Sequence, residues 1–191
     1  MNSTVLWGLV LEFRMKAVLS QEEVPEVQRQ LEALRGVQPL KPMTDHYYVH
    51  SSKPFTPGEE ALRIRVTPQG SVITHRGGLK DPESKSQLET TLKVSGGQAH
   101  DFLVALGFNQ IKQVVKQRRT YVLNGFELHL DHVEGLGWFL QAVRSVNKQA
   151  DMPLAKLEAQ RLFKRFNLAK FEPRSYLELL LENNGAGATA G

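Results

Sequence analysis

Basic residues recur at every second position in several segments of the chain. Arg14 and Lys16 follow Glu12, and the segment 61–66 repeats the spacing with Arg63 and Arg65. Because alternate side chains of a strand share one face, each segment predicts a strand with one charged face. Arginine and lysine gathered in this way suit a polyanion, since the guanidinium fork matches phosphate oxygens. The bases with this spacing are Arg14, Lys16, Arg63, Arg65, Arg76, Lys93, Lys116 and Arg118.

Acidic residues are interspersed among these bases on the same alternate positions. Carboxylates beside phosphate-binding bases are typical of a site for Mg²⁺ or Mn²⁺, which bridges carboxylates to phosphate oxygens. If the charged faces line one shared lumen, the ligand we expect is a triphosphate with a divalent metal. The acids concerned are Glu12, Glu89, Glu127 and Asp131, with Glu134 just after them.

Two other interpretations of the charged faces remain open at this point. The charges could face solvent and form cross-strand ion pairs, each of which contributes little stability. The basic strands could also bind nucleic acid, but few aromatic residues are available to stack on bases: Tyr47, Tyr48 and Tyr121 are the candidates. The recurrence of bases on several strands favours the lumen, and we do not expect a nucleic-acid partner.

Composition narrows the class of protein. The chain has 191 residues, a net charge of +4 and no cysteine, which excludes a disulfide scaffold, thiol chemistry and cysteine–zinc sites. No apolar run reaches the length of a membrane span, and the start of the chain lacks the features of a signal peptide. We therefore expect a cytoplasmic protein without a membrane partner.

The charged residues must be positioned by short strands joined by tight turns. Asn124-Gly125 is typical of a two-residue hairpin turn. We predict an α+β fold, an eight-stranded antiparallel β-barrel with flanking helices, whose interior could hold one small ligand. Residues 1–182 would form this single domain, and 183–191 a disordered tail. The predicted strands are 6–18, 45–50, 61–66, 72–76, 87–94, 113–122, 126–131 and 138–143, and the predicted helices are 20–36, 98–106, 153–166 and 175–181.

Five segments, taken in order, resemble one family. They are 11–16, 45–48, 60–65, 106–108 with 115–121, and 130–137, and the segment 175–180 is similar to the family's C-terminal helix. The family is that of the CYTH proteins, also called triphosphate tunnel metalloenzymes, which include class IV adenylate cyclases and thiamine triphosphatase. The resemblance covers nearly the whole chain and is greatest to the cyclase-like branch.

The resemblance implies an antiparallel tunnel that grips a triphosphate, such as ATP, tripolyphosphate or thiamine triphosphate. It implies metal-assisted phosphoryl or nucleotidyl transfer, with Mg²⁺ or Mn²⁺ as cofactor. Carried onto this chain, the phosphate-binding residues are Arg14, Lys16, Arg63, Arg65, Arg76, Lys116 and Arg118. The metal ligands would be Glu12, Glu89, Glu127, Asp131 and Glu134, of which Glu12, Asp131 and Glu134 are the catalytic candidates.

The start of this chain differs from the opening signature of the family. The family has Glu-x-Glu-x-Lys, and alignment on the charged face places Val10, Glu12 and Arg14 at those three positions. A shift of two residues would place Glu12 first and Arg14 at the second acidic position instead. Either alignment removes one acid.

Two later acidic positions also differ from the family pattern. Thr91 takes the place of the second acid of a pair that begins with Glu89, and Gln141 and Val143 stand where the family has Glu-x-Glu. Two hypotheses follow: an active triphosphatase or cyclase with a depleted metal site, and a non-catalytic module that binds a nucleotide or polyphosphate. A homodimer is left open.

Overall fold

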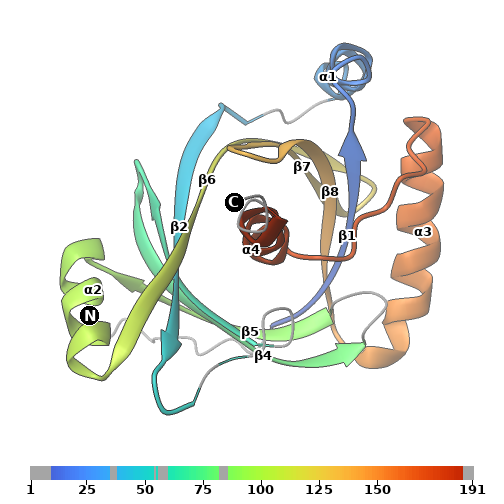
Figure 1. Ribbon diagram of the computed structural model, residues 1–191. Helices are drawn as coiled ribbons and strands as arrows, with labels where there is room; N and C mark the ends of the chain where they lie inside the picture. Colours follow the sequence, from blue (N-terminus) through green and yellow to red (C-terminus); the bar gives the residue numbers. More distant parts are fainter. Residues whose placement is uncertain (1–9, 35–37, 54, 56–59, 82–85, 187–191) are drawn as a thin grey trace, which may run out of the picture.

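Eight antiparallel strands close into a barrel (Figure 1). The computed structural model describes residues 10–34, 38–53, 55, 60–81 and 86–186. Around the ring the strands follow the order β1-β5-β4-β3-β2-β6-β7-β8, and β8 pairs with β1. The strands are β1 Val10–Leu19, β2 Lys41–His50, β3 Ala61–Thr67, β4 Gly70–Asp81, β5 Ser86–Val94, β6 Phe108–Leu123, β7 Phe126–Val133 and β8 Gly137–Val146. The predicted fold class is confirmed; positions 6–9 of the first predicted strand lie outside the described residues.

The β6–β7 hairpin turns at Asn124 and Gly125, as the sequence predicts. Both residues have positive φ angles, 51° and 75°, which is the conformation of a type I′ turn. This turn fixes the register in which Arg118 lies opposite Asp131. A one-residue slip would turn every charged side chain of these strands to the other face.

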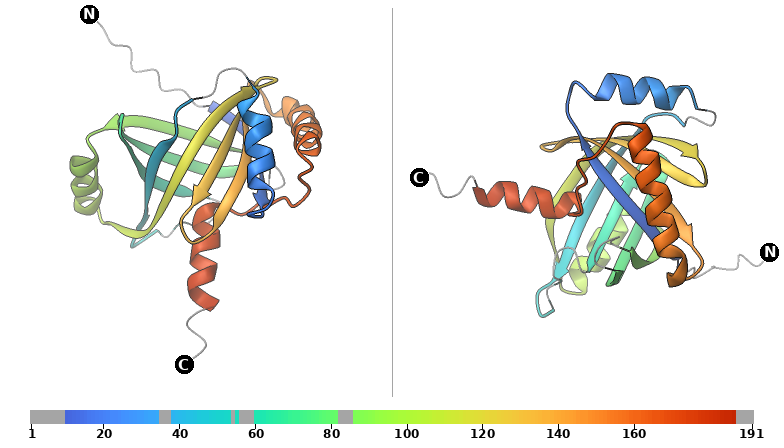
Figure 2. Two further views of the ribbon diagram at one scale, coloured as in Figure 1. Left: turned by 90° about the horizontal axis from the view of Figure 1, so that it is seen from above. Right: turned by 90° about the vertical axis from the view of Figure 1, so that its right-hand side faces the viewer.

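The main hydrophobic core lies outside the barrel wall. The outward apolar residues of the strands, among them Phe13, Leu128 and Leu140, are buried under two helices. These helices are α1, Val24–Glu32, and α3, Met152–Arg165, and both lie against the outer surface of the barrel in Figures 1 and 2. Because the apolar faces of the strands are covered from outside, their charged faces are left for the interior.

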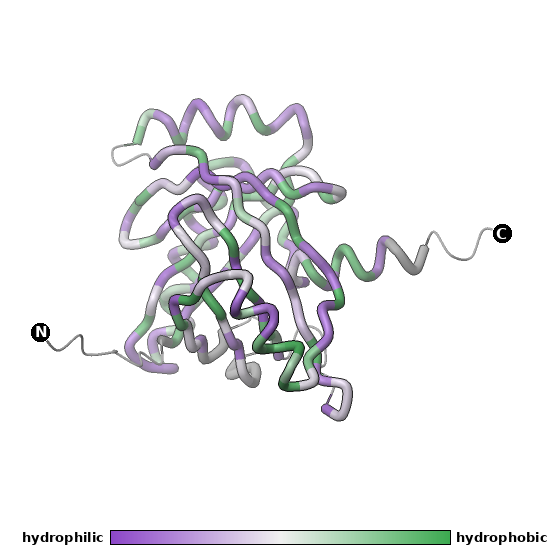
Figure 3. The backbone as a smooth tube through the Cα atoms, turned by 90° about the vertical axis from the view of Figure 1, so that its left-hand side faces the viewer, coloured by the Kyte–Doolittle hydropathy of each residue, from purple (hydrophilic) through white to green (hydrophobic). Residues whose placement is uncertain are grey.

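A smaller core covers another part of the outer wall. The helix α2, Gly96–Ala105, packs Ala99 and Leu103 against Leu62 and Ile64 of β3. Leu62 and Ile64 alternate with Arg63 and Arg65, so burial of the first pair turns the arginines inward. Figure 3 shows hydrophilic and hydrophobic positions following one another along the strands.

The last helix, α4, spans Tyr176–Ala186 and begins at one end of the barrel. Figure 1 looks along this helix in the middle of the ring, and Figure 2 shows it extending outward from the barrel. Ser175 and Glu178 form a reciprocal capping box, with bonds of 2.6 and 3.2 Å. The helix extends to Ala186, so residues 183–186 of the predicted tail are helical, whereas 187–191 lie outside the described residues.

A short 3₁₀ turn, Gln149–Asp151, joins β8 to α3. No helix within the described ranges is long and apolar enough to cross a membrane.

Candidate functional site

The interior of the barrel contains a charged cavity of about 310 Å³. All seven bases that the sequence assigns to phosphate binding line it, so the predicted convergence of the basic faces is observed. Lys41 and His129 also line the cavity, which the sequence does not predict. Lys93, which the sequence groups with these bases, is exposed and does not line it. We call this cavity the lumen; its ionisable lining residues apart from tyrosines are Glu12, Arg14, Lys16, Lys41, Arg63, Arg65, Arg76, Glu89, Lys116, Arg118, Glu127 and His129.

Asp45 is the acid around which one side of the lumen is built. Its side chain is fully buried and accepts two bonds from Arg65, of 2.6 and 2.8 Å, and one of 2.6 Å from Lys116. Arg63 lies 3.5 Å away. Although burial acts to raise it, these three cations hold the pKa of Asp45 well below its usual range. Asp45 thus fixes three phosphate-binding candidates in one arrangement.

Sequence reasoning did not assign a role to Asp45. The available signal was its position two residues before Tyr47, which places it on the inward face of β2, directly opposite Arg65 of β3. A lone acid facing a basic strand is a candidate for an internal ion pair.

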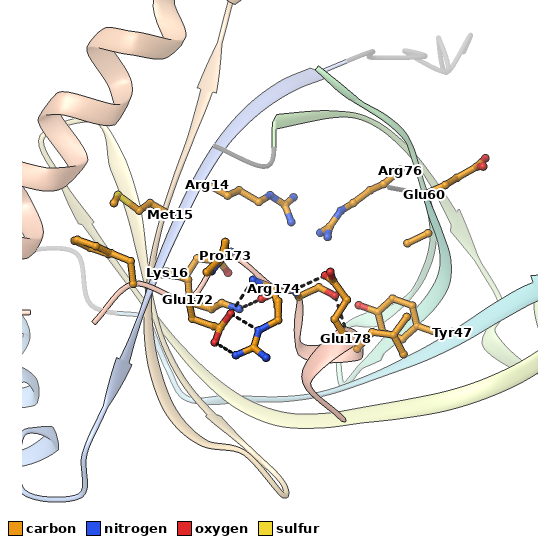
Figure 4. A pocket seen from close by; sticks show the side chains of 15 residues that line it. Arg14, Met15, Lys16, Tyr47, Glu60, Arg76, Glu172, Pro173, Arg174 and Glu178 are labelled. Atoms are coloured by element: carbon orange, nitrogen blue, oxygen red, sulfur yellow. Dashed lines mark hydrogen bonds and ion pairs between the residues drawn. The ribbon is translucent and has the colours of Figure 1, made fainter. Parts of the chain in front are cut away.

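Glu89 organises the opposite side of the lumen. Its carboxylate accepts bonds of 2.7 Å from Arg14 Nη2 and 2.7 Å from Arg76 Nε. Figure 4 shows Arg14 and Arg76 pointing toward one another. Burial first, and then the charges of Arg14 and Arg63, lower the pKa of Arg76 to about 9. Glu89 therefore compensates the two guanidinium groups only in part, and the pair favours an additional anion.

Glu12 lies on the same strand as Arg14. Its Oε2 accepts a bond of 2.8 Å from Arg14 Nε and is also contacted by Arg14 Nη2. Arg14 therefore bridges two carboxylates, one from β1 and one from β5.

Asp131 is fully buried behind the lumen rather than open to it. Arg118 donates two bonds to it, of 2.7 and 2.6 Å, and the Tyr176 hydroxyl donates a third of 2.9 Å. Although burial acts to raise it, the Arg118 guanidinium holds the pKa of Asp131 at about 2. The carboxylate therefore orients Arg118 and attaches the start of α4 to the barrel.

Lys16 lies deeper along the lumen, next to α4. Its ammonium group donates to the backbone carbonyl of Arg174 and lies 4.7 Å from the centre of the Tyr176 ring. Burial lowers the pKa of Lys16 to about 8, against the opposing effect of Glu172. This lysine can therefore change its charge within a readily accessible pH range.

The α4 end of the lumen is apolar and filled. Tyr176 and Leu177 are buried there in one cluster with Val114, Val133 and Phe139. The rings of Phe139 and Tyr176 lie 4.9 Å apart. A ligand in the lumen is thus bounded at this end by side chains of α4.

The opposite end contains Glu127 and His129 of β7. Glu127 is 62% exposed and lies 3.1 Å from His129 Nε2. Burial, with Arg118 nearby, lowers the pKa of His129 to about 4, so the ring is neutral at pH 7. Glu127 is the most solvent-accessible acid of the lumen lining.

Glu134 does not reach the lumen. Strand β7 ends at Val133, and Glu134 lies exposed in the turn that follows, where its backbone N–H donates to Val115. The alternation that turns Glu127 and Asp131 inward does not continue into a turn. Glu134 therefore does not lie with the inward acids, and its assignment as a metal ligand stays a prediction.

The remaining acids do not form a preformed metal site. Glu12, Glu89 and Asp131 each accept a bond from an arginine, Glu127 lies at the far end beside His129, and Thr91 is exposed. Across the described ranges, no group of three or more histidine, aspartate or glutamate side chains is arranged to hold a metal ion. The donor set present does not fit the divalent cation that the sequence resemblance implies.

A second cavity of about 270 Å³ adjoins the lumen beside α4 (Figure 4). It shares Arg14, Lys16 and Arg76 with the lumen, and the segment 171–175 and Leu177 close it on the other side. Its walls are less charged than those of the lumen, and they leave room for a group attached to a phosphate chain.

Comparison with known proteins identifies the same family by two routes. The CYTH domain family model matches residues 11–170. A protein of Methanocaldococcus jannaschii named "Putative adenylate cyclase MJ0240" is 30% identical over 138 residues, which cover 71% of this chain and 79% of that protein.

Solved structures share the barrel. The PH1819 protein of Pyrococcus horikoshii OT3 superposes with a TM-score of 0.81 at 31% identity, covering 90% of this chain and 99% of that one. The Hippeastrum protein named "Putative adenylyl cyclase HpAC1", which is described as having a dominant triphosphatase activity, gives a TM-score of 0.69 at 13% identity, covering 91% of this chain and 96% of that one. The second likeness concerns the fold alone.

Proposed function

The chain belongs to the CYTH domain family, and on this premise we propose that its lumen binds the triphosphate group of a small molecule. The observation that carries the proposal is the convergence of seven predicted bases, from β1, β3, β4 and β6, on one cavity. The bases of the lining outnumber its acids, so the lumen holds surplus positive charge. Surplus positive charge in a partly buried cavity favours a polyanion of high charge density.

Arg63 supplies a second argument for an anion. Its side chain is 6% exposed, and among the described residues no partner accepts a bond from its Nε. A buried donor without a partner is costly, and a phosphate oxygen would satisfy it. Arg63 is therefore the residue we expect to contact the ligand most directly.

The ligand class comprises ATP, tripolyphosphate and thiamine triphosphate. The adjoining cavity beside α4 has room for an organic group, which favours a nucleotide or thiamine compound over bare tripolyphosphate. The relatives named adenylate cyclase support phosphoryl or nucleotidyl transfer as the general kind of reaction. The CYTH family is generally dependent on divalent metals.

Direct titration tests the proposal. Isothermal titration calorimetry with tripolyphosphate, ATP and thiamine triphosphate, each in EDTA and with Mg²⁺ or Mn²⁺, should detect binding to at least one. In Arg63→Gln we expect affinity to fall about tenfold or more, because a charge-assisted bond is lost. Asp45 keeps Arg65 and Lys116 in that variant, so the fold should persist.

Arg119→Gln is the matched control. Arg119 pairs with Glu32 of α1 on the outer surface of the barrel, and its loss should leave binding unchanged. Absence of binding to all three compounds under every metal condition would refute the proposal. Binding to oligonucleotides with a steep salt dependence and no preference for triphosphates would support the nucleic-acid alternative instead.

Release of phosphate or pyrophosphate in the same samples separates an enzyme from a non-catalytic binder. Turnover with Mg²⁺ or Mn²⁺ would establish the enzyme. Tight binding without turnover would establish the binding module.

A further inference from the structure

Arg14 occupies the position of a cation between two carboxylates of the lumen. Its Nη2 contacts Glu12 on β1 and, at 2.7 Å, Glu89 on β5. Mg²⁺ in phosphate-binding sites is commonly held by one or two carboxylates and completes its coordination with phosphate oxygens. Here a guanidinium from the chain itself already lies between two such carboxylates.

The same guanidinium retains donors for a phosphate. An arginine has five N–H donors in a fixed fork, and Arg14 directs Nε and Nη2 to the two acids. No residue in the described part of the chain accepts a bond from its Nη1. Arg14 can therefore contact carboxylates and a phosphate at once, which is the geometric role of a bridging metal.

Neighbouring positions lack the charge that a metal would need. Val143 lies directly opposite Arg14 in the β1–β8 register, and Gln141 lies opposite Lys16. Both line the lumen and both are neutral. A divalent ion placed beside Arg14 at Glu89 would meet two cations, Arg14 and Arg76, and no additional carboxylate from β8. Glu12 and Glu89 are already paired with these two arginines.

We propose that the lumen binds its triphosphate without a divalent metal, with the Arg14 guanidinium bridging Glu12 and Glu89 to the phosphate chain. This inference rests on the proposed function, because it specifies how the same cavity holds its ligand. On this proposal Glu12 and Glu89, which the sequence assigns to a metal, instead orient the guanidinium of Arg14.

Calorimetry with tripolyphosphate is the first arm of the test. The wild-type protein should bind tripolyphosphate in EDTA, and added Mg²⁺ should weaken the apparent affinity because the metal competes for the free polyphosphate. Binding that disappears in EDTA and returns with Mn²⁺ would overturn this inference while leaving the proposed function intact. Absence of binding under all conditions would instead overturn the proposed function.

Arg14→Gln is the second arm. It removes the bridging charge and leaves Glu12 and Glu89 with an uncompensated site, so affinity for tripolyphosphate in EDTA should fall about tenfold or more. Mn²⁺ should restore part of it. The variant should also bind Mn²⁺ without phosphate, measured by electron paramagnetic resonance, whereas the wild-type protein should not.

Two further variants keep the test interpretable. Arg119→Gln, outside the barrel, should behave as the wild type in both measurements. Arg14→Lys retains the charge but has one nitrogen, so it should bind tripolyphosphate in EDTA with intermediate affinity and no Mn²⁺. Wild-type affinity of Arg14→Gln in EDTA, with a melting curve that shows it folded, would contradict the proposal. If Arg14→Gln fails to fold, the wild-type protein decides the question by itself. Binding of Mn²⁺ to the wild type without phosphate would then contradict the proposal.

Discussion

Arg65 lies directly opposite Asp45 across β2 and β3, and its guanidinium donates bonds of 2.6 and 2.8 Å to that buried carboxylate. Arg118 and Asp131 repeat this arrangement across β6 and β7. In both pairs the acid is fully buried and the base faces the cavity. The buried acids of this barrel thus set the direction of its bases.

Replacing the buried acid should therefore damage both stability and binding. Asp45→Asn leaves Arg63, Arg65 and Lys116 without their shared carboxylate, and breaking a buried ion pair from one side costs about 3–5 kcal/mol. We expect a loss of that order in the free energy of unfolding, measured by urea denaturation. Saturating tripolyphosphate should recover part of it, since a ligand that binds only the folded state stabilises it.

Glu32→Gln is the control for this measurement. Glu32 forms a partly exposed pair with Arg119, and surface pairs contribute about 0–1 kcal/mol. An equal effect of both substitutions would show that burial of Asp45 does not decide its importance.

An acid added beside Arg14 should compete with the ligand. In Val143→Glu the new carboxylate lies opposite Arg14 across β8 and β1 and can accept the donors that we assign to phosphate. We expect affinity for tripolyphosphate to fall about tenfold, because a charge-assisted bond is diverted, as measured by calorimetry. Gln117→Glu, exposed on the outer face of β6, adds the same charge outside the lumen and should change affinity far less.

The charged interior and apolar outer surface of the barrel could be predicted from the alternation of charged and apolar residues along the strands. Phe13 between Glu12 and Arg14, and Ile64 between Arg63 and Arg65, show which face each strand buries, and the helices supply the apolar cover. The hairpin at Asn124-Gly125 was also predictable, because only residues that tolerate positive φ form a type I′ turn.

Partnerships between distant residues could not be predicted in the same way. Asp131 was assigned to metal, yet it lies within reach of Tyr176, 45 positions later in the chain. A period-two pattern identifies a face but not how deep along the lumen a side chain lies, nor which cation reaches it first. Glu134 illustrates the same limit, since the pattern does not mark where the strand ends.

The charge of Lys16 should make stability depend on pH. Burial lowers its pKa to about 8 from 10.5, so between these values the unfolded chain binds the proton more strongly than the folded protein. Stability should therefore rise as pH increases from about 8 to 10.5, with a slope of at most about 1.4 kcal/mol per pH unit. Urea denaturation of the wild type and of Lys16→Met across this range measures the contribution of Lys16. Below pH 7 the stabilities of the two proteins should change with pH at the same rate, although their absolute values differ.

Triphosphate binding should show the opposite trend. A neutral Lys16 no longer attracts phosphate, so affinity should decline above about pH 8 in the wild type. The groups that act on this lysine are Glu172, Glu178, Asp131 and Arg174. Lys16→Met should bind more weakly at pH 7 and lose the decline above pH 8. A decline that persists in the variant would assign it to another group.

The hydroxyl of Tyr176 should couple α4 to the lumen. It donates a 2.9 Å bond to Asp131, while the ring packs 4.9 Å from that of Phe139. Tyr176→Phe keeps the ring contacts and removes one bond to a buried carboxylate, so we expect a loss of about 1.5–3 kcal/mol in the free energy of unfolding. Asp131 keeps both bonds from Arg118, which should limit the effect on tripolyphosphate affinity. Faster hydrogen exchange confined to the start of α4 would locate the loss at this contact, whereas unchanged stability and exchange would show that packing alone holds the helix at the barrel end.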